Sequence, residues 1–256
     1  MVFTDSLETD FTKIAEMGQA DDWIRQEFNV AVSEGRGEYG KAFRVENVFT
    51  TTESSHDTGL TLRVGAGVVD NAISAAELDT ARLDMYHGSF RAGMKIPQVK
   101  GTCAAFFWYF NDTQEIDIEF LTREFEPDKQ IYPVHLVIQP KETGTGGMHQ
   151  QVHLDFDPTA AFHEYRIDYL PGRVVFYADS RPLAAMEGDG VPQVGGHLIL
   201  QHWSNGDPQW SGGPPEEDAL LAVRYVQAYF NSSLPDGGRS KSAARRCVVQ
   251  ETISHV

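Results

Sequence analysis

The 256-residue sequence has little cysteine, few helical patterns and no long apolar run. Its two cysteines, Cys103 and Cys247, are too few for a disulfide framework and leave a single pairing open. Cys103 lies in an apolar stretch typical of a buried small side chain, whereas Cys247 lies in a polar tail. No stretch approaches the roughly 18 apolar residues of a membrane span, so we expect no membrane partner.

Basic residues are also scarce, with 21 Lys and Arg against 37 Asp and Glu, for a net charge of -16. Such a chain repels phosphate backbones, which argues against nucleic acid as a partner and suits a neutral substrate. The N-terminus lacks the basic and apolar regions of a signal peptide.

Period-two alternation of apolar and polar residues indicates an all-β domain. It places Ile24, Gln26, Phe28 and Val30 on one side of a half-buried strand. The same alternation puts Tyr165, Ile167 and Tyr169 on one side of another.

A meander follows, with turns at 171–172 and 179–180, strands over 173–178 and 182–186, and a last strand over 222–230. A short helix is expected only over 10–17. Short strands with Gly and Pro between them favour a sandwich or barrel, and a jelly roll is one option. Composition turns Ser-, Gly- and Arg-rich after Asn231, so we expect a domain over 1–231 and a flexible polar tail over 232–256.

The most informative segment is Glu115–Leu121 (EIDIEFL), which alternates acidic and apolar residues. On a strand, Glu115, Asp117 and Glu119 share one face and the apolar residues share the other. On a helix, at about 100° per residue, Asp117 would point away from both glutamates. Isoleucine prefers strands, so the pattern predicts a strand.

Neighbouring acids on this face lie roughly 6.6 Å apart along the strand. Mutual repulsion at this distance raises the pKa of at least one of them. A proton donor beside an ionised carboxylate is the pair that glycoside hydrolysis requires. Two alternatives stay open from the pattern alone, an acidic face open to solvent and a calcium site of oxygen ligands.

The residues at this point resemble glycoside hydrolase family 16, which includes lichenases, laminarinases and cell-wall transglycosylases. The motif Glu115–Leu121 carries the resemblance, and three other segments occur in the family's order and spacing: 105–109 (AFFWY), 162–169 (FHEYRIDY) and 201–206 (QHWSNG) followed by Trp210. The segment 101–111 (GTCAAFFWYFN) resembles filamentous-fungal members.

The resemblance implies a β-jelly-roll of two antiparallel sheets with the sugar chain across one of them. It implies that Glu115 is the nucleophile, that Glu119 is the acid/base and that Asp117 tunes Glu115. It also implies retention of anomeric configuration.

Sugar contacts follow from the same resemblance. Phe107 and Tyr109 match the aromatic strand before the motif, and Trp203 and Trp210 match platform residues. Flat aromatic faces stack on the apolar faces of sugar rings. His135 and Gln201 are expected to contact hydroxyl groups.

Two departures concern specificity. Lichenases carry Glu and Arg on a strand that we align with 90–95, where Arg91 and Gly93 stand. This puts mixed-linkage specificity in question. The regular spacing of the acids is similar to that of lichenases and the transglycosylases, and Trp210-Ser211-Gly212-Gly213 resembles the transglycosylases.

The leading hypothesis is therefore an endo-acting, retaining hydrolase of β-1,3- or β-1,3/1,4-glucan. The alternatives are a transglycosylase of the same family and a non-catalytic carbohydrate-binding lectin. We expect a secreted monomer that acts on a polysaccharide and requires no cofactor. Glycan occupancy at the sequons of Asn111 and Asn231 and a structural calcium both stay open. His149 and His153 are four apart, but their segment is predicted as loop into strand, so no catalytic metal is expected.

Overall fold

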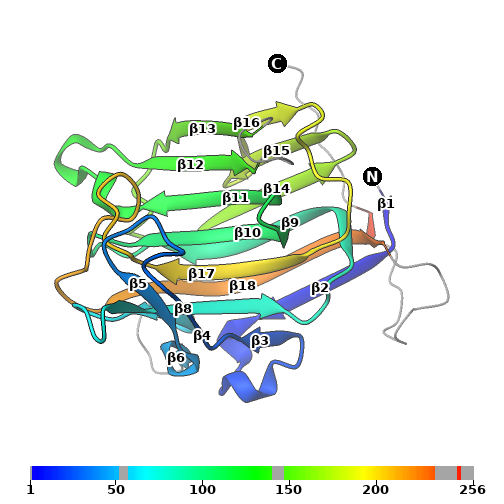
Figure 1. Ribbon diagram of the computed structural model, residues 1–256. Helices are drawn as coiled ribbons and strands as arrows, with labels where there is room; N and C mark the ends of the chain where they lie inside the picture. The colour runs from blue at the N-terminus through cyan, green and yellow to red at the C-terminus, as the bar shows by residue number, and fades with distance from the viewer. Residues whose placement is uncertain (1, 52–56, 140–146, 234–246, 249–256) are drawn as a thin grey trace.

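The computed structural model describes residues 2–51, 57–139, 147–233 and 247–248. Two β-sheets stack face to face, as Figure 1 shows with the nine-stranded sheet towards the viewer. In spatial order this sheet contains β13 (Met148–His153), β12 (Pro133–Ile138), β11 (Gln114–Leu121), β10 (Cys103–Asn111), β17 (His197–Trp203), β8 (Ala72–Thr80), β5 (Gly40–Phe43) and β4 (Phe28–Val30), with β3 (Trp23–Arg25) also beside β8. Its pairs are antiparallel except β5 with β8.

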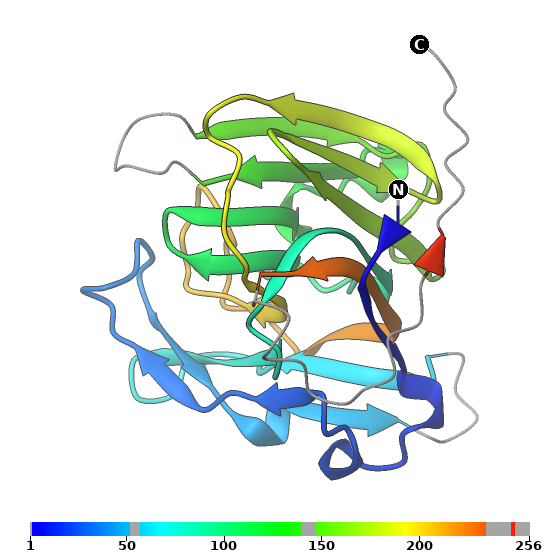
Figure 2. The ribbon, with the colours of Figure 1, turned by 90° about the vertical axis from the view of Figure 1, so that its right-hand side faces the viewer.

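The eight-stranded sheet lies behind it. Its order is β16 (Arg181–Glu187), β15 (Arg173–Ala178), β14 (His163–Leu170), β9 (Met85–Lys95), β18 (Ala219–Ser232), β7 (Gly59–Val64) and β6 (Val48–Thr51), with β2 (Asp5–Asp10) also beside β18. A separate pair joins β1 (Val2–Phe3) to β19 (Cys247–Val248), side by side in Figure 2. The short 3-10 turns are η1 (Phe11–Lys13), η2 (Met17–Gln19), η3 (Val45–Asn47), η4 (Thr122–Glu124) and η5 (Pro127–Lys129).

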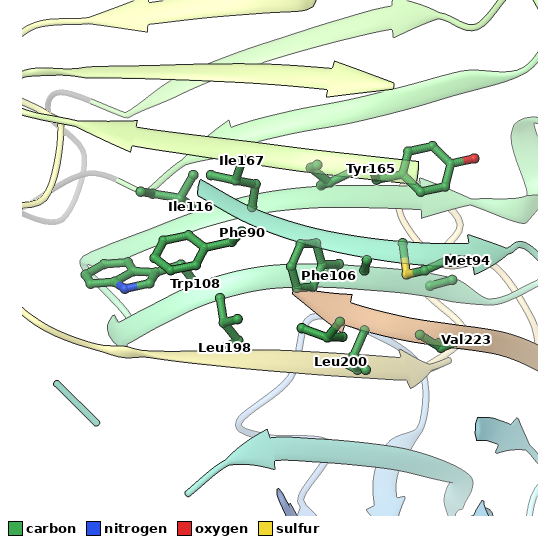
Figure 3. Packing of buried hydrophobic residues seen from close by; sticks show 14 of the residues in the cluster. Phe90, Met94, Phe106, Trp108, Ile116, Tyr165, Ile167, Leu198, Leu200 and Val223 are labelled. Atoms are coloured by element: carbon green, nitrogen blue, oxygen red, sulfur yellow. The ribbon is translucent and has the colours of Figure 1, made fainter. Parts of the chain in front are cut away.

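The hydrophobic core fills the space between the sheets, where each strand turns every second side chain inward (Figure 3). Phe106 and Trp108 of β10 meet Phe90 and Ile167 of the opposite sheet there. The indole Nε1 of Trp108 donates to the carbonyl of Met85 at 2.8 Å, so this large side chain is buried without an unsatisfied donor. The other face of the nine-stranded sheet, hereafter the open face, points away from this core.

Most of the predicted strands are confirmed. The alternation at Tyr165, Ile167 and Tyr169 is fully buried in β14, and the meander of β14, β15 and β16 follows with turns at 171–172 and 179–180. The predicted last strand is β18, which begins earlier and ends later than its apolar centre.

Two local predictions are wrong. Residues 24–30 form two short strands, β3 and β4, and Ile24 and Phe28 are 49% and 39% exposed. The alternation there reflects an edge of the sheet with little packed over it. The helix expected over 10–17 is replaced by the single turn η1, because Asp10 ends β2 and caps that turn through Thr12.

The structure also shows where Arg91 and Gly93, which were aligned with the lichenase strand, are placed. Both lie on β9, which belongs to the eight-stranded sheet and not to the sheet of the acidic strand. Arg91 forms an ion pair with Glu164 at 3.7 Å on that sheet. Both residues therefore lie on the sheet opposite to the one that carries the three acids.

Most of the predicted polar tail, residues 234–246 and 249–256, lies outside the described residues. Ser232 ends β18, and the backbone of Cys247–Val248 forms β19. Within the described residues, no helix has the length and apolar character needed to cross a membrane.

Candidate active site

The three acids of β11 lie on the open face, near the middle of the nine-stranded sheet. Ile116, Ile118 and Phe120 are fully buried in the core on the opposite face, which confirms the predicted division of the strand. Register with the flanking strands places Asp117 between Phe107 of β10 and Val137 of β12. The acids are thus fixed by a strand that is paired on both sides.

Asp117 is the most deeply buried of the three, with 2% of its surface exposed. Gln139 Nε2 lies 3.4 Å from its Oδ2, and Oδ1 has no donor among the described residues. Burial raises the pKa of Asp117 well above its ordinary value, and the neighbouring charges of Glu115 and Glu119 raise it further. The raised pKa favours the protonated form of Asp117, which can act as a donor towards Glu115.

Burial is also the main cause that raises the pKa of Glu115, to about 7. The hydrogen bond from Asp117 opposes this shift, while the charge of Glu119 adds to it. The predicted rise in pKa is confirmed, but repulsion is the lesser cause. Loss of water around the carboxyls contributes more than their mutual charge.

Glu119 receives two hydrogen bonds at the same oxygen. Cys103 Sγ lies 3.3 Å and Trp210 Nε1 3.5 Å from Glu119 Oε1. Burial raises the pKa of Glu119, and these two donors partly offset that rise because they favour the ionised carboxylate. Raised pKa values suit a proton donor near neutral pH.

The aromatic residues of β10 that the resemblance singled out lie on the same sheet as the three acids. Phe107 and Tyr109 share the open face, and Phe107 packs with Ala105 and Ile199 in a small apolar cluster. Tyr109 stands opposite Glu115 and donates its hydroxyl to Asp112 at 2.7 Å. Phe107 is only 6% exposed, so little of its ring is available to stack on a sugar.

The two tryptophans are half-buried on either side of Cys103 and Glu119. Trp203 is opposite Cys103 in the register, and Lys41 Nζ lies 4.3 Å from the centre of its ring. Trp210 sits in the loop after β17, where Arg123 Nε donates to its carbonyl at 2.6 Å. Both side chains are therefore held in place before any ligand binds.

The two residues predicted to contact sugar hydroxyls, His135 and Gln201, form hydrogen bonds with other side chains of the protein. His135 bonds through Nε2 to Glu124 at 2.8 Å and through Nδ1 to His149 at 2.9 Å. Gln201 donates to Glu77. His135 is 5% exposed, and its ring lies 5.1 Å from that of Trp210, so in this state it supports the tryptophan.

Sequence reasoning missed a second pair of acids, Glu77 and Asp79 on β8. They lie on the same sheet as β11, with β10 and β17 between the two strands, and Gln26 donates to Asp79 at 2.8 Å. Burial raises the pKa of Asp79 to about 8, and the charge of Glu77 adds to the shift. The alternation Glu77-Leu78-Asp79, with Leu78 in the core, was the available signal.

Lys41 of β5 is the cation near these acids, and it was also missed. Burial lowers the pKa of Lys41, while Glu77, Glu119 and Glu115 favour its charged form. The parallel pairing of β5 with β8 brings it there, and this pairing has no local sequence signature. Among the described residues, no group of three or more His, Cys, Asp or Glu is arranged to hold a metal ion.

Comparison with known proteins assigns the family. The model of glycosyl hydrolases family 16 matches residues 35–221. The chain belongs to glycoside hydrolase family 16. The matched range contains the acidic strand of β11, both tryptophans and the second acid pair, so the candidate site is part of the family's domain and not an addition to it.

Curated relatives of this family member include plant and bacterial proteins. A probable xyloglucan endotransglucosylase/hydrolase protein 27 of Arabidopsis thaliana is 27% identical over 194 residues, covering 72% of this chain and 53% of the relative. A beta-glucanase of Paenibacillus macerans is 28% identical over 192 residues, covering 73% of this chain and 75% of the relative. Of a second beta-glucanase, from Paenibacillus polymyxa, the chain spans 56% of the length.

Solved structures share the fold. The Bacillus licheniformis beta-glucanase matches with a TM-score of 0.69 at 19% identity, covering 88% of this chain and 97% of that one. The catalytic domain of a laminarinase from Thermotoga petrophila RKU-1 matches with a TM-score of 0.68 at 19% identity, covering 88% and 98%. The family member is therefore a jelly-roll sandwich, as predicted.

Proposed function

We propose that this family 16 protein is a retaining endo-β-glucanase that hydrolyses β-1,3- or β-1,3/1,4-linked glucan. The observation that carries the proposal is the arrangement on β11. Three carboxyls share the open face, and each has a raised pKa and a different neighbour. A lectin would have no use for three buried acids with raised pKa values on one strand face.

In the first step the ionised Glu115 attacks the anomeric carbon while Glu119 gives its proton to the departing glycosidic oxygen. The glycosidic bond breaks and an ester bond to Glu115 forms. Asp117 lies two residues along the same strand face and lowers the pKa of Glu115, which favours the ionised nucleophile. In the second step Glu119 takes a proton from water, whose oxygen attacks the anomeric carbon and frees Glu115.

The substrate assignment is tested by incubating the protein with laminarin, lichenan, xyloglucan and chitin fragments. Proton NMR then follows the first product. We expect turnover of laminarin or lichenan with the new reducing end in the β configuration. An α product that forms first, or turnover of chitin fragments alone, would contradict the proposal.

A transglycosylase is the second candidate. It is supported by the names of the Arabidopsis relatives and by Trp210-Ser211-Gly212-Gly213. The two activities share the first step and differ in whether water or a sugar hydroxyl reaches the glycosyl-enzyme. Adding an oligosaccharide acceptor separates them, because products longer than the donor arise only by transfer.

The resemblance of residues 101–111 to filamentous-fungal members supports a further proposal, that the enzyme acts outside the cell on cell-wall glucan as a monomer. Glycan on the sequon at Asn111, an exposed residue, would support this placement. Mass spectrometry of the protein from its native source tests it, and enzyme found only in the cytosol would contradict it.

A further inference from the structure

The thiol of Cys103 has no function in the mechanism above, although it is the donor nearest to the acid/base group. Cys103 is free and fully buried, and its Sγ lies 3.3 Å from Glu119 Oε1. In the register it stands diagonally across from Glu119, whose direct partner on β10 is Ala105. The small side chain of Ala105 leaves room for the Glu119 carboxyl to lean towards the thiol.

The contact is directional. A carboxylate oxygen accepts and a thiol donates, so the proton of the bond belongs to Cys103. Burial and the neighbouring Glu119 both raise the pKa of the Cys103 thiol well above its ordinary value. The thiol therefore keeps its proton, and remains a donor, throughout the pH range in which the enzyme works.

Both donors to Glu119 reach the same oxygen. The indole of Trp210 points at Oε1 at 3.5 Å, and none of the described residues hydrogen-bonds Oε2. Two donors on one oxygen fix the rotation of the carboxyl group and distinguish its two oxygens. Oε2 is then the oxygen left to exchange a proton with substrate and water.

We propose that Cys103 is a positioning residue for the acid/base Glu119, and that its S–H donation to Oε1 directs proton transfer through Oε2. This inference rests on the proposed function, in which Glu119 is the acid/base. Trp210 supplies the second donor and is itself anchored by Arg123. Cys103 touches neither sugar nor reacting atom, so its effect passes through Glu119.

Three variants separate hydrogen bonding from packing. Cys103→Ser keeps a donor in a smaller side chain, Cys103→Ala removes the donor and volume, and Cys103→Val removes the donor but fills the space. If hydrogen-bond donation matters, the activity of Cys103→Ser should match that of the parent, and Cys103→Ala and Cys103→Val should lose similar activity. If packing matters, Cys103→Ser and Cys103→Ala should lose similar activity and Cys103→Val should differ from both.

The first readout is kcat/KM on two substrates, a glucan and an aryl glycoside whose phenolate leaves without protonation. If the Glu119 carboxyl is misplaced, kcat/KM on the glucan should fall by about 10-fold in Cys103→Ala and Cys103→Val. On the aryl glycoside, kcat/KM should stay nearly unchanged. The alkaline limb of the glucan profile should move to higher pH in these two variants, because a donor that stabilised the carboxylate is lost. Equal losses on both substrates, or Ser grouped with Ala, would overturn the proposal.

A second readout does not need turnover. Carbon-13 NMR of labelled glutamate follows the titration of Glu119, assigned by its absence in Glu119→Gln. We expect the pKa of Glu119 to be higher in Cys103→Val than in the parent and in Cys103→Ser. Identical titrations of Glu119 in all three would overturn the positioning role. Failure of the proposed function is seen separately, as a parent protein that turns over neither substrate.

Discussion

Asp117 combines two properties that rarely occur together in a carboxyl group, since it is almost fully buried and lies among other acids. A buried charge with an incomplete set of partners is costly, and protonation removes most of that cost. The interaction with Asp117 lowers the pKa of Glu115 and so favours its ionised form. One side chain of the motif thus prepares its neighbour.

Glu115→Gln tests the nucleophile directly. The amide cannot form the ester intermediate, so we expect kcat on the preferred glucan to fall by at least about 1,000-fold. Circular dichroism and the melting temperature should match those of the parent. Glu46→Gln, an exposed acid on η3, is the matched control and should keep full activity. Substantial turnover by the Glu115→Gln variant would remove Glu115 from its role.

Asp117 variants test the internal hydrogen bond through the pH profile. Asp117→Ala removes the donor that lowers the pKa of Glu115, so the acid limb of kcat/KM should move to higher pH. Asp117→Asn keeps an N–H donor at nearly the same volume and should shift the limb less. The comparison of the two limbs is the measurement, and equal shifts would show that donation is unimportant.

At the scale of elements, β11 carries the three acids of the candidate site on one face and core residues on the other. The alternation of Glu115–Leu121 was enough to predict the strand and the shared face of the acids. The register with β10 and β12 was not predictable, since it depends on pairing with segments that carry no matching signal. For the same reason β8 could not be placed from the sequence, because it joins the sheet of the three acids by pairing with β17.

Ile118→Ala tests how much this strand depends on its core face. Ile118 is fully buried between the sheets, so we expect the free energy of unfolding to fall by about 2–5 kcal/mol. Ile24→Ala, at a position 49% exposed, is the control and should change it by less than about 0.5 kcal/mol. Urea unfolding of both variants measures the difference, and similar losses would contradict the burial pattern.

The elements that were predicted wrongly share a cause. Alternation at 24–30 predicts a buried face, but burial needs a neighbour on that side, and β3 and β4 lie where the sheet has little cover. The sheet to which 90–95 belongs could not be predicted from the sequence either. A strand pattern does not say which of two sheets the strand joins.

For the whole molecule, stability should fall as pH rises through neutrality. Asp79 has a pKa of about 8 in the folded protein against an ordinary value of 3.8, so the folded state holds a proton that the unfolded chain has lost. Between pH 6.5 and 8 this one group contributes a loss of about 1.6 kcal/mol, because the slope of about 1.4 kcal/mol per pH unit halves as the pH reaches the folded pKa. Raised pKa values at Glu77 and Asp117 act in the same direction.

Urea midpoints at pH 6.5 and pH 8 measure this loss. Asp79→Asn, which cannot ionise, should show a smaller drop between the two pH values than the parent. A matched change at the exposed Glu46 should leave the drop unaltered. A parent midpoint that is independent of pH would contradict the buried acid pair.

Long-range contacts were the part of the site that the sequence could not supply. Glu119 meets Cys103 from 16 residues away and Trp210 from 91, and Trp210 is placed by Arg123. Residue type and parity identified the acids, and the family resemblance identified the aromatics. The partners of each group came only from the folded sandwich, and those partners decide which carboxyl holds a proton.

The central claim is that Glu115 carries the glycosyl group during turnover, and covalent trapping tests it most directly. A 2-deoxy-2-fluoro glucosyl or laminaribiosyl donor with a dinitrophenolate leaving group slows the second step, so the ester accumulates. Peptide mapping by mass spectrometry should place the sugar on Glu115. A label on Glu119 or elsewhere, or steady glucan turnover with no trapped ester, would contradict the account.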